Sequence, residues 1–353
     1  MKRAYCRLLA VLGMVAGLTG CTSVSYYAQS LNGHMNLMAA RRDVGTLIGD
    51  PSTSPALRSR LDTARSIRQF ATDELALPDN DSYRDYVDVG RDYVTLAVYA
   101  APEFALAPHV WCFAVFGCVP YRGYFSEKSA VEEARDLKGQ GLDVYVAGVV
   151  AYSTLGWSSD PLLNTMLGDD EAYLAGTVFH ELAHQRVYVD GDSSFNEAFA
   201  VAVETTGVEK WLRTAGDAAA LRRYEAGRKR QADFLALVSQ TRQELRRVYE
   251  SVESPDQKRA AKAAAIERLR ERYRQVRDRR WGGYRAYDGW FDAPINNAKL
   301  AATSVYNDRV PAFLRLFDLC SDDYPRFYEA VRRIGAVDRA DRAKALETAK
   351  TCD

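Results

Sequence analysis

The chain has 353 residues, of which 47% are apolar, 11% aromatic and 27% charged, and its 47 Lys and Arg balance 47 Asp and Glu. This composition excludes collagen-like, mucin-like and disordered chains, and the zero formal charge argues against a protein built mainly to bind nucleic acid. Only four residues are His, and two of them, His180 and His184, stand four positions apart.

The first 20 residues predict a cleaved signal peptide. Three cations precede an apolar run from Leu8 to Leu18, which is too short to span a bilayer. The sequence LTGC at 18–21 resembles a bacterial lipobox, in which cleavage precedes the Cys and its thiol carries the lipid. This resemblance implies a lipid anchor at Cys21, and Thr22 in place of Asp implies the outer membrane, facing the periplasm. The alternative is a plain secretory signal with an incidental Cys.

Four cysteines remain once Cys6 leaves with the signal and Cys21 is lipidated. An even number in an oxidising periplasm favours two disulfides, for which three pairings are possible. We favour two pairs, of which the first closes a small loop and the second ties down the C-terminal tail: Cys112 with Cys118, and Cys320 with Cys352. The alternative is that these are buried free thiols.

Apolar residues recur at helical spacing in the first part of the mature chain, from Tyr26 to about Leu47 and from Ser54 to Leu75, where Ser54-Pro55 is a typical helix start. Between about 93 and 155, segments rich in Val, Tyr and Phe are separated by Gly and Pro, which predicts strands and hairpins. Three more helices are expected, one between these strands and two after them: Ser126–Gln140, Glu171–Val187 and Asn196–Leu212.

The long charged segment from Asp217 to Arg280 predicts a helical hairpin. The sequence SPDQ at 254–257 has a Ser cap, Pro at the first helical position and Gln three residues after the cap, so one helix ends near Glu253 and another begins. Residues 221–280 contain 18 Lys and Arg against 9 Asp and Glu. This excess favours a solvated helical face with salt-bridging partners, and binding of anionic lipid or polysaccharide is the alternative.

No linker precedes the last part of the chain, so residues 21–353 are expected to form a single domain. The predicted fold class is α+β and predominantly helical, with a small sheet before the Glu171–Val187 helix and the long hairpin at about 217–280 after it.

The sequence HELAH at 180–184 predicts a zinc site. Four helical residues turn 400°, so His180 and His184 project from one face, where both imidazoles can reach one Zn²⁺. Glu181 projects about 100° away, where it can accept a proton from metal-bound water instead of binding the metal. The alternative is a helix with two His and no metal.

A catalytic zinc has three protein ligands and an open position for water. No His follows His184, so the third ligand is a carboxylate or comes from upstream. Glu197 opens the next predicted helix, and Glu204 follows seven residues later on the same face. We expect one of them to bind the metal and the other to orient a ligand His through a hydrogen bond.

The sequences HELAHQ at 180–185 and NEAFA at 196–200 resemble the HELAHQ and NEGFA pair of aminopeptidase N-like gluzincins. The resemblance implies that Glu197 is the third ligand and that Glu204 supports a ligand His. Those enzymes place 18 residues between the second His and the Glu, whereas this chain places 12 before Glu197 and 19 before Glu204. Glu204 therefore stays open as the ligand.

A closer resemblance covers nearly the whole chain. Five stretches are similar to a family of bacterial lipoproteins named putative aminopeptidases: CFAVFGCVPYRGYFSE, AGVVAYSTLGWSSDPLLNTML, FHELAHQ, FNEAFA and INNAKLAATSVYNDRVPAF. The resemblance implies a zincin-like metallopeptidase core, one Zn²⁺ per chain and a peptide or protein substrate. It leaves the side-chain preference and the oligomeric state open.

The segment from Val144 to Leu155 precedes the HExxH helix. In thermolysin-like folds the corresponding strand forms a sheet edge that pairs with extended substrate. Tyr152, Ser153 and Thr154 therefore line the cleft or, equally, serve a core or turn role. Aminopeptidase N-like enzymes anchor the substrate amine with a Glu on this strand, and this chain has no acidic residue there. Exopeptidase and endopeptidase activity both stay open.

Tyr306 is our candidate donor to the oxyanion that develops during amide hydrolysis, because gluzincins commonly use a Tyr or His outside the metal helices. It lies in a predicted helix from Asn297 to Asn307. A core Tyr is the alternative.

The leading prediction is zinc-dependent peptide-bond hydrolysis in the cell envelope, with Glu181 activating the zinc-bound water. The alternative is a non-enzymatic envelope lipoprotein with a structural zinc and a partner-binding helical hairpin. A structural zinc is closed by four protein ligands, whereas a catalytic zinc leaves a position for water.

Overall fold

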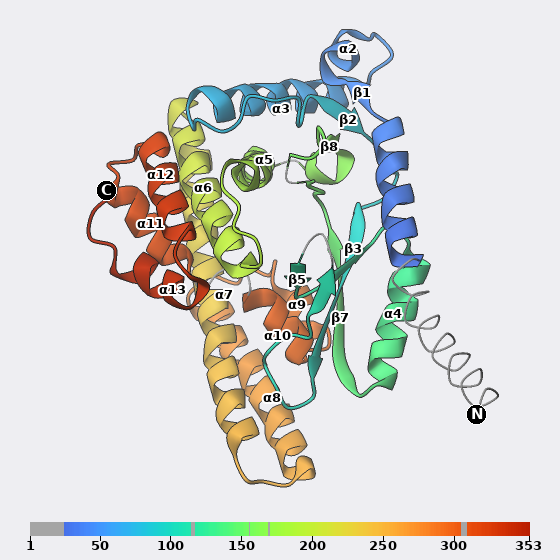
Figure 1. The fold of residues 1–353 in the computed structure, drawn as a ribbon, viewed down its shortest axis with the longest axis vertical. Helices are drawn as coiled ribbons and strands as arrows, with labels where there is room; N and C mark the ends of the chain where they lie inside the picture. Colours follow the sequence, from blue (N-terminus) through green and yellow to red (C-terminus); the bar gives the residue numbers. More distant parts are fainter. Residues whose placement is uncertain (1–24, 114–116, 155, 169, 305–308) are drawn as a thin grey trace, which may run out of the picture.

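A computed structural model describes residues 25–113, 117–154, 156–168, 170–304 and 309–353. The predicted signal peptide, the predicted lipidation site Cys21 and the candidate donor Tyr306 lie outside the described residues. Within these ranges the chain is predominantly helical with small sheets, as predicted. Figure 1 shows the helices arranged around one slender sheet, with the α7–α8 hairpin extending away from the rest. None of the described helices has the length and apolar character needed to cross a membrane.

The predicted helix from Tyr26 to Leu47 is interrupted at residues 40–43. A helix over 25–39 is followed by strand β1 (Arg42–Asp43) and helix α2 (Val44–Gly49). The Asp43 side chain accepts a hydrogen bond from the Thr46 N–H, so it caps a new helix instead of continuing the old one. The apolar residues keep their helical spacing through the segment, but one helix ends at residue 39 and the cap at Asp43 starts another.

Helix α3 (Pro55–Asp73) begins where the sequence predicts, because the Ser54 side chain accepts from the Leu57 N–H and Pro55 takes the first helical position. Strand β2 (Asp85–Val87) follows and lies between β1 and β8 (Leu162–Leu163) in a three-stranded sheet.

The central sheet has the order β6-β3-β7 and is antiparallel throughout. Its strands are β3 (Thr95–Pro102), β6 (Arg122–Tyr124) and β7 (Leu142–Val149). β7 is thus an edge strand, and it ends six residues before the predicted Leu155. A separate hairpin, β4 (Trp111–Phe113) with β5 (Gly117–Val119), is closed by the Cys112–Cys118 disulfide.

The two faces of β3 bury different neighbours, because successive side chains point to opposite sides of a strand. Leu96, Val98 and Ala100 pack against α4 (Glu127–Gly139), and Ala97 packs with Ala298 of α10 (Asn297–Ser304) on the other face. Figure 1 shows α4 and α10 on opposite sides of β3 and β7.

Helices α5 (Glu171–Arg186) and α6 (Ser193–Thr214) form the centre of the largest core cluster. Gly176 faces Glu204 and Val208, whereas His184 faces Glu197, so the two helices run antiparallel. A Cβ on Gly207 would come within 2.8 Å of the Phe179 ring. Glycine there allows the close approach that brings side chains of both helices together.

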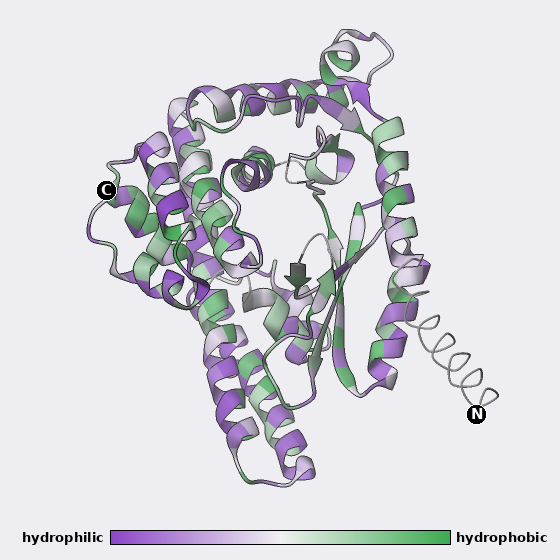
Figure 2. Cartoon of the chain, viewed as in Figure 1, coloured by the Kyte–Doolittle hydropathy of each residue, from purple (hydrophilic) through white to green (hydrophobic). Residues whose placement is uncertain are grey.

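The predicted hairpin is confirmed as α7 (Ala218–Glu250) and α8 (Pro255–Arg279). Ser254 and Gln257 form the expected capping box at the start of α8. Leu245 and Leu269 are fully buried between the helices, whereas the outer surface of the hairpin is largely hydrophilic (Figure 2).

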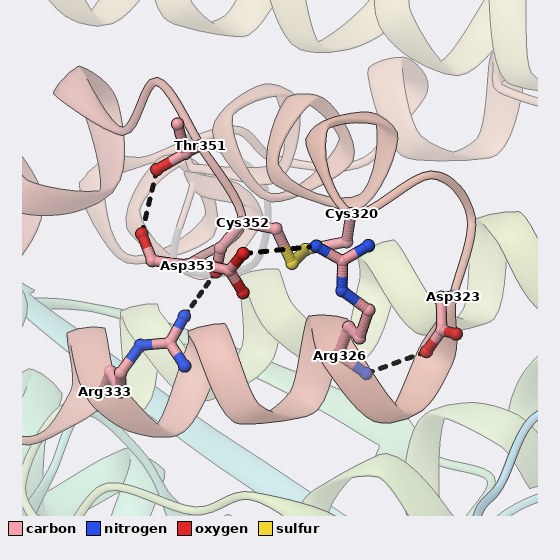
Figure 3. Close-up of a disulfide and its surroundings, with 7 residues drawn as sticks. All are labelled: Cys320, Asp323, Arg326, Arg333, Thr351, Cys352 and Asp353. Atoms are coloured by element: carbon pink, nitrogen blue, oxygen red, sulfur yellow. Dashed lines mark hydrogen bonds and ion pairs between the residues drawn. A yellow bond between two sulfur atoms is a disulfide. The ribbon is translucent and has the colours of Figure 1, made fainter.

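The C-terminal region is a set of short helices that pack on the side of α6 away from the central sheet (Figure 1). Its elements, after α9 (Asp288–Asp292) and α10, are α11 (Val310–Leu319), α12 (Tyr324–Gly335) and α13 (Arg339–Thr348). A Cys320–Cys352 disulfide ties the last residues to the end of α11, and Arg333 donates to the Cys352 carbonyl (Figure 3). Both disulfides have the pairing that the sequence analysis favours.

Candidate metal centre and its cavity

Three side chains from α5 and α6 bring their ligand atoms together. The Glu197 Oε2 lies 3.2 Å from the His180 Nε2 and 3.6 Å from the His184 Nε2, and all three ligand atoms lie within 4.8 Å of one another. The side chains are well enclosed, with exposed fractions of 15%, 6% and 17% for His180, His184 and Glu197. The sequence predicted this set, and the antiparallel packing of the two helices assembles it.

The surroundings of His180 favour a positive charge at the candidate centre. The other ring nitrogen, Nδ1, lies 3.2 Å from the Glu204 Oε2. A neutral ring that donates Nδ1–H to Glu204 points the lone pair of Nε2 at the Glu197 carboxylate, which is repulsive unless a proton or a metal ion lies between them. Burial alone would lower the pKa of His180, but the two carboxylates hold it well above its ordinary value.

The pKa of Glu197 is shifted in the opposite direction to that of His180. Burial on its own would raise the pKa of Glu197, but the adjacent His184 and His180 lower it well below the ordinary range of a glutamate. The group is therefore an anion at neutral pH, ready to bind either protonated imidazole or a metal.

The donor set fits zinc. Two imidazole nitrogens and one carboxylate oxygen are the usual ligands of a catalytic zinc, and ligands at 2.0–2.1 Å in a tetrahedral site are about 3.4 Å apart. The distances from the Glu197 Oε2 to the Nε2 atoms of His180 and His184, 3.2 and 3.6 Å, lie on either side of that value. The 3.6 Å separation is long for a hydrogen bond. The buried Nδ1 of His184 has no hydrogen-bond partner among the described residues.

Glu204 occupies the supporting position that the resemblance implies. Its carboxylate contacts the far side of the His180 ring and forms no hydrogen bond or ion pair with His184. Gly176 of α5 makes this possible, because a Cβ there would lie 3.2 Å from the Glu204 Cγ. A larger residue at this point would displace Glu204 from the ring.

The candidate metal centre opens into a cavity of about 1870 Å³. Glu181 lines it beside the two His and makes no hydrogen bond or ion pair with a described residue. Small-molecule sites usually occupy about 300–1,000 Å³, so this cavity has room for an extended chain. The walls come from the helix over 25–39, from β3, from the segment after β7 and from α7.

The residues that follow β7 are placed in this cavity by a buried carboxylate. Tyr152, Ser153 and Thr154 all line the cavity. Asp160, which is fully buried, accepts hydrogen bonds from the Thr154 N–H and hydroxyl and from the Ser153 hydroxyl. Burial raises the pKa of Asp160 to about 6, although its hydrogen bonds with Thr154 oppose the shift. The segment thus serves both as cavity wall and as an ordered turn.

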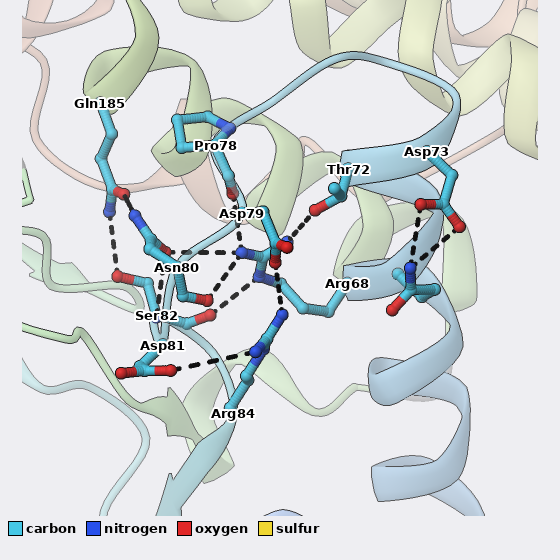
Figure 4. Close-up of polar contacts among 11 residues, drawn as sticks. Arg68, Thr72, Asp73, Pro78, Asp79, Asn80, Asp81, Ser82, Arg84 and Gln185 are labelled. Atoms are coloured by element: carbon cyan, nitrogen blue, oxygen red, sulfur yellow. Dashed lines mark hydrogen bonds and ion pairs between the residues drawn. The ribbon is translucent and has the colours of Figure 1, made fainter.

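A polar network fixes the end of the metal helix (Figure 4). Gln185, the residue after His184, accepts from the Asn80 side chain at 2.7 Å and donates to the Ser82 hydroxyl at 3.2 Å. The buried Arg68 of α3 holds the same loop by donating to the backbone carbonyls of Pro78, Asn80 and Ser82. The sequence did not predict this support, because its partners lie about 100 residues apart.

The loop between α5 and α6 is held in a similar way. The Asn196 side chain both accepts from and donates to the backbone of Val189, at 2.8 Å in each case. Asp192 caps α6, which begins at Ser193, three residues before the predicted Asn196, and Asp192 also pairs with Arg309 and Arg342. These contacts set the position of Glu197 near the start of α6.

Two tyrosines near the centre were missed by the sequence analysis. Tyr121 and Tyr188 line the cavity. Burial raises the pKa of both, and the nearby Glu197 carboxylate raises it further, so both keep their phenolic proton at neutral pH. Tyr121 lies in the family-like stretch CFAVFGCVPYRGYFSE, but that stretch does not show which of its residues face the cavity, and no motif marks Tyr188 among the 21 Tyr of the chain.

Two imidazoles and one carboxylate that could hold a single ion thus lie beside the Glu181 carboxylate in a large cavity. The family model described as "Putative aminopeptidase" matches residues 25–346, and the chain belongs to this family. No match was found among the curated proteins or among the solved structures.

Proposed function

We propose that the protein is a zinc-dependent peptidase, with the metal held by His180, His184 and Glu197. The observation that supports this most directly is the convergence of these three ligand atoms beside the free carboxylate of Glu181 at the wall of one cavity. Zinc bound there would polarise a peptide carbonyl and lower the pKa of water. The family supplies the broader assignment, a peptidase.

Residues of the chain can also supply proton transfer, stabilisation of the oxyanion and binding of the peptide backbone. Glu181 accepts a proton from the attacking water and returns it to the leaving amine. Tyr121 and Tyr188 keep their protons and line the same cavity as Glu197, which makes them candidates, beside Tyr306, for donating to the developing oxyanion. The edge strand β7 and the segment after it offer backbone groups for an extended peptide.

The alternative of a structural zinc requires a fourth protein ligand. Among the described residues only His180, His184 and Glu197 form a group that could hold a metal. The position toward the cavity is therefore left for water and substrate, which favours catalysis.

The location of the enzyme is part of the proposal. We propose that Cys21 is lipidated and that the protein is anchored in the cell envelope, on the outer membrane facing the periplasm. The two disulfides support an oxidising compartment. Fractionation of cells that express the native chain or Cys21→Ala tests this, and equal release of both into the soluble fraction would contradict it.

The experiment that tests the activity combines metal content with a peptide library. The purified mature protein is expected to contain about one zinc per chain and to cleave peptides, whereas Glu181→Gln keeps the zinc and loses at least about 10²-fold in rate. A matched control, Glu171→Gln, changes a carboxylate at the start of the same helix outside the cavity lining and should cleave normally. Cleavage at an unchanged rate by Glu181→Gln would remove Glu181 from its role, and absence of bound zinc would refute the centre.

A further inference from the structure

The positive charge of the helical hairpin is distributed unevenly. Many arginines in the part away from the cavity have carboxylate partners, including Arg259 with Glu103, Arg268 and Arg272 with Glu244, Arg277 with Asp288, and Arg280 with Asp233. This part matches the predicted solvated face with salt-bridging partners.

The cavity end of α7 is different. Arg223, Arg228 and Arg230 line the cavity, and none of them forms an ion pair with a described residue. Arg228 donates to the Gln231 side chain at 3.2 Å, and the Arg230 guanidinium lies 4.1 Å from the centre of the Tyr284 ring. We call these three side chains the arginine wall. These contacts hold the guanidinium groups of Arg228 and Arg230 in place, and Arg223 interacts with the charge of Asp217 without forming a direct ion pair.

Gly227 lies in the middle of the arginine wall. A Cβ at this position would meet only the Arg230 Nη2, at 3.9 Å, so no packing requirement excludes a side chain. Glycine in the interior of a helix is less favourable than alanine. Here it leaves open space between the arginines, on the side of the helix that lines the cavity.

The arginine wall belongs to the same cavity as the candidate metal centre. Tyr224 lines this cavity as well, and the charges of Glu204, which contacts His180, and of Arg228 both act on the pKa of its hydroxyl. Glu181, Glu197 and Asp190 line the same cavity. The cavity therefore presents both carboxylates and guanidinium groups to a ligand.

We propose that the arginine wall binds a carboxylate of the peptide substrate, so that the enzyme prefers anionic peptides. The inference rests on the proposed peptidase function and adds the substrate class. Guanidinium groups bind carboxylates through paired, charge-assisted hydrogen bonds. With the negative group held at α7, the peptide is oriented with its scissile bond toward the candidate metal centre.

The carboxylate can come from an acidic side chain or from the C-terminus of the peptide. Four matched peptides separate these sources, with Glu or Gln side chains and with a free or an amidated C-terminus. Binding is measured by fluorescence anisotropy on the full-length chain with Glu181→Gln, which prevents turnover. We expect at least tenfold tighter binding of the peptides that carry the recognised carboxylate, at low ionic strength.

Three combined variants test the arginine wall. R223Q/R228Q/R230Q should erase the preference, and R223K/R228K/R230K should keep the fold and a reduced preference, because charge remains but the paired hydrogen bonds do not. R222Q/R246Q/R247Q removes the same charge from exposed positions of α7 outside the cavity lining and should keep the preference. Circular dichroism verifies folding.

Equal binding of all four peptides by the native arginine wall would overturn the proposal. A loss of the preference in R222Q/R246Q/R247Q as large as in R223Q/R228Q/R230Q would overturn it as well. A loss in R223Q/R228Q/R230Q that affects only binding to phosphatidylglycerol vesicles would also overturn it, in favour of a lipid surface. Failure of the proposed function gives a different result, because Glu181→Gln would then hydrolyse peptides at an undiminished rate.

Discussion

The Oε2 of Glu204 lies 3.2 Å from the Nδ1 of His180, on the side of the imidazole opposite to Glu197. The ring is therefore held by a carboxylate at each nitrogen. Since one carboxylate fixes the tautomer, the other nitrogen is free to bind a metal together with Glu197 and His184. This arrangement gives the two glutamates different roles that can be separated by mutation.

Glu197→Ala and Glu204→Ala should weaken zinc binding to very different degrees. Loss of Glu197 removes a ligand, so we expect no zinc to be retained in competition with a chromogenic chelator. Loss of Glu204 removes only the support of His180, and should lower the affinity about 10–100-fold. The reverse order would show that Glu204 is the third ligand.

Asp160 should make stability depend on pH. Its folded-state pKa of about 6 lies above the ordinary value of 3.8, so the folded state binds this proton more tightly. The contribution is fully present below pH 3.8 and is lost as the pH rises through about 6, and it amounts to about 2–3 kcal/mol at most. The difference between the native chain and Asp160→Asn in urea unfolding, followed from pH 4 to 7, isolates this group. Parallel pH profiles for the two proteins would contradict the prediction.

The two disulfides should differ in their contribution to stability. The bond Cys320–Cys352 spans 32 residues and Cys112–Cys118 spans six. A disulfide stabilises the fold by reducing the conformational entropy of the unfolded chain, and more so for a longer loop. We therefore expect the free energy of unfolding to fall by about 3–4 kcal/mol in the double alanine variant of the first pair and by about 2 kcal/mol in that of the second. Guanidinium unfolding measures both, and a larger loss at the short loop would show that native contacts outweigh chain entropy.

Arg68→Met should destabilise the fold near the metal helix. The substitution leaves the carbonyls of Pro78, Asn80 and Ser82 without their buried donor, and each such group costs about 1–3 kcal/mol. We expect a loss of at least about 3 kcal/mol in the free energy of unfolding. Arg65→Met is the matched control on the same helix: Arg65 is exposed and pairs only with Asp62, so its loss should cost less than about 1 kcal/mol. Similar effects of the two variants would contradict a role for this network.

The sequence by itself determined the features that depend on neighbours within a few residues. The spacing of His180 and His184 fixes both on one helix face, and the caps at Ser54 and Ser254 start their helices where predicted. The α7–α8 hairpin was predictable for the same reason. The helix predicted across Asp43 failed because the local cap outweighed the apolar periodicity.

Tertiary structure decided the relationships between distant segments. The antiparallel packing of α5 and α6 determines that Glu197 meets both His while Glu204 meets only His180, and sequence spacing allowed either arrangement. It also places Tyr121 and the arginine wall at one cavity. The physical reason is that local hydrogen bonds and periodicity fix the shape of each helix, whereas the faces that meet depend on core packing across the whole chain.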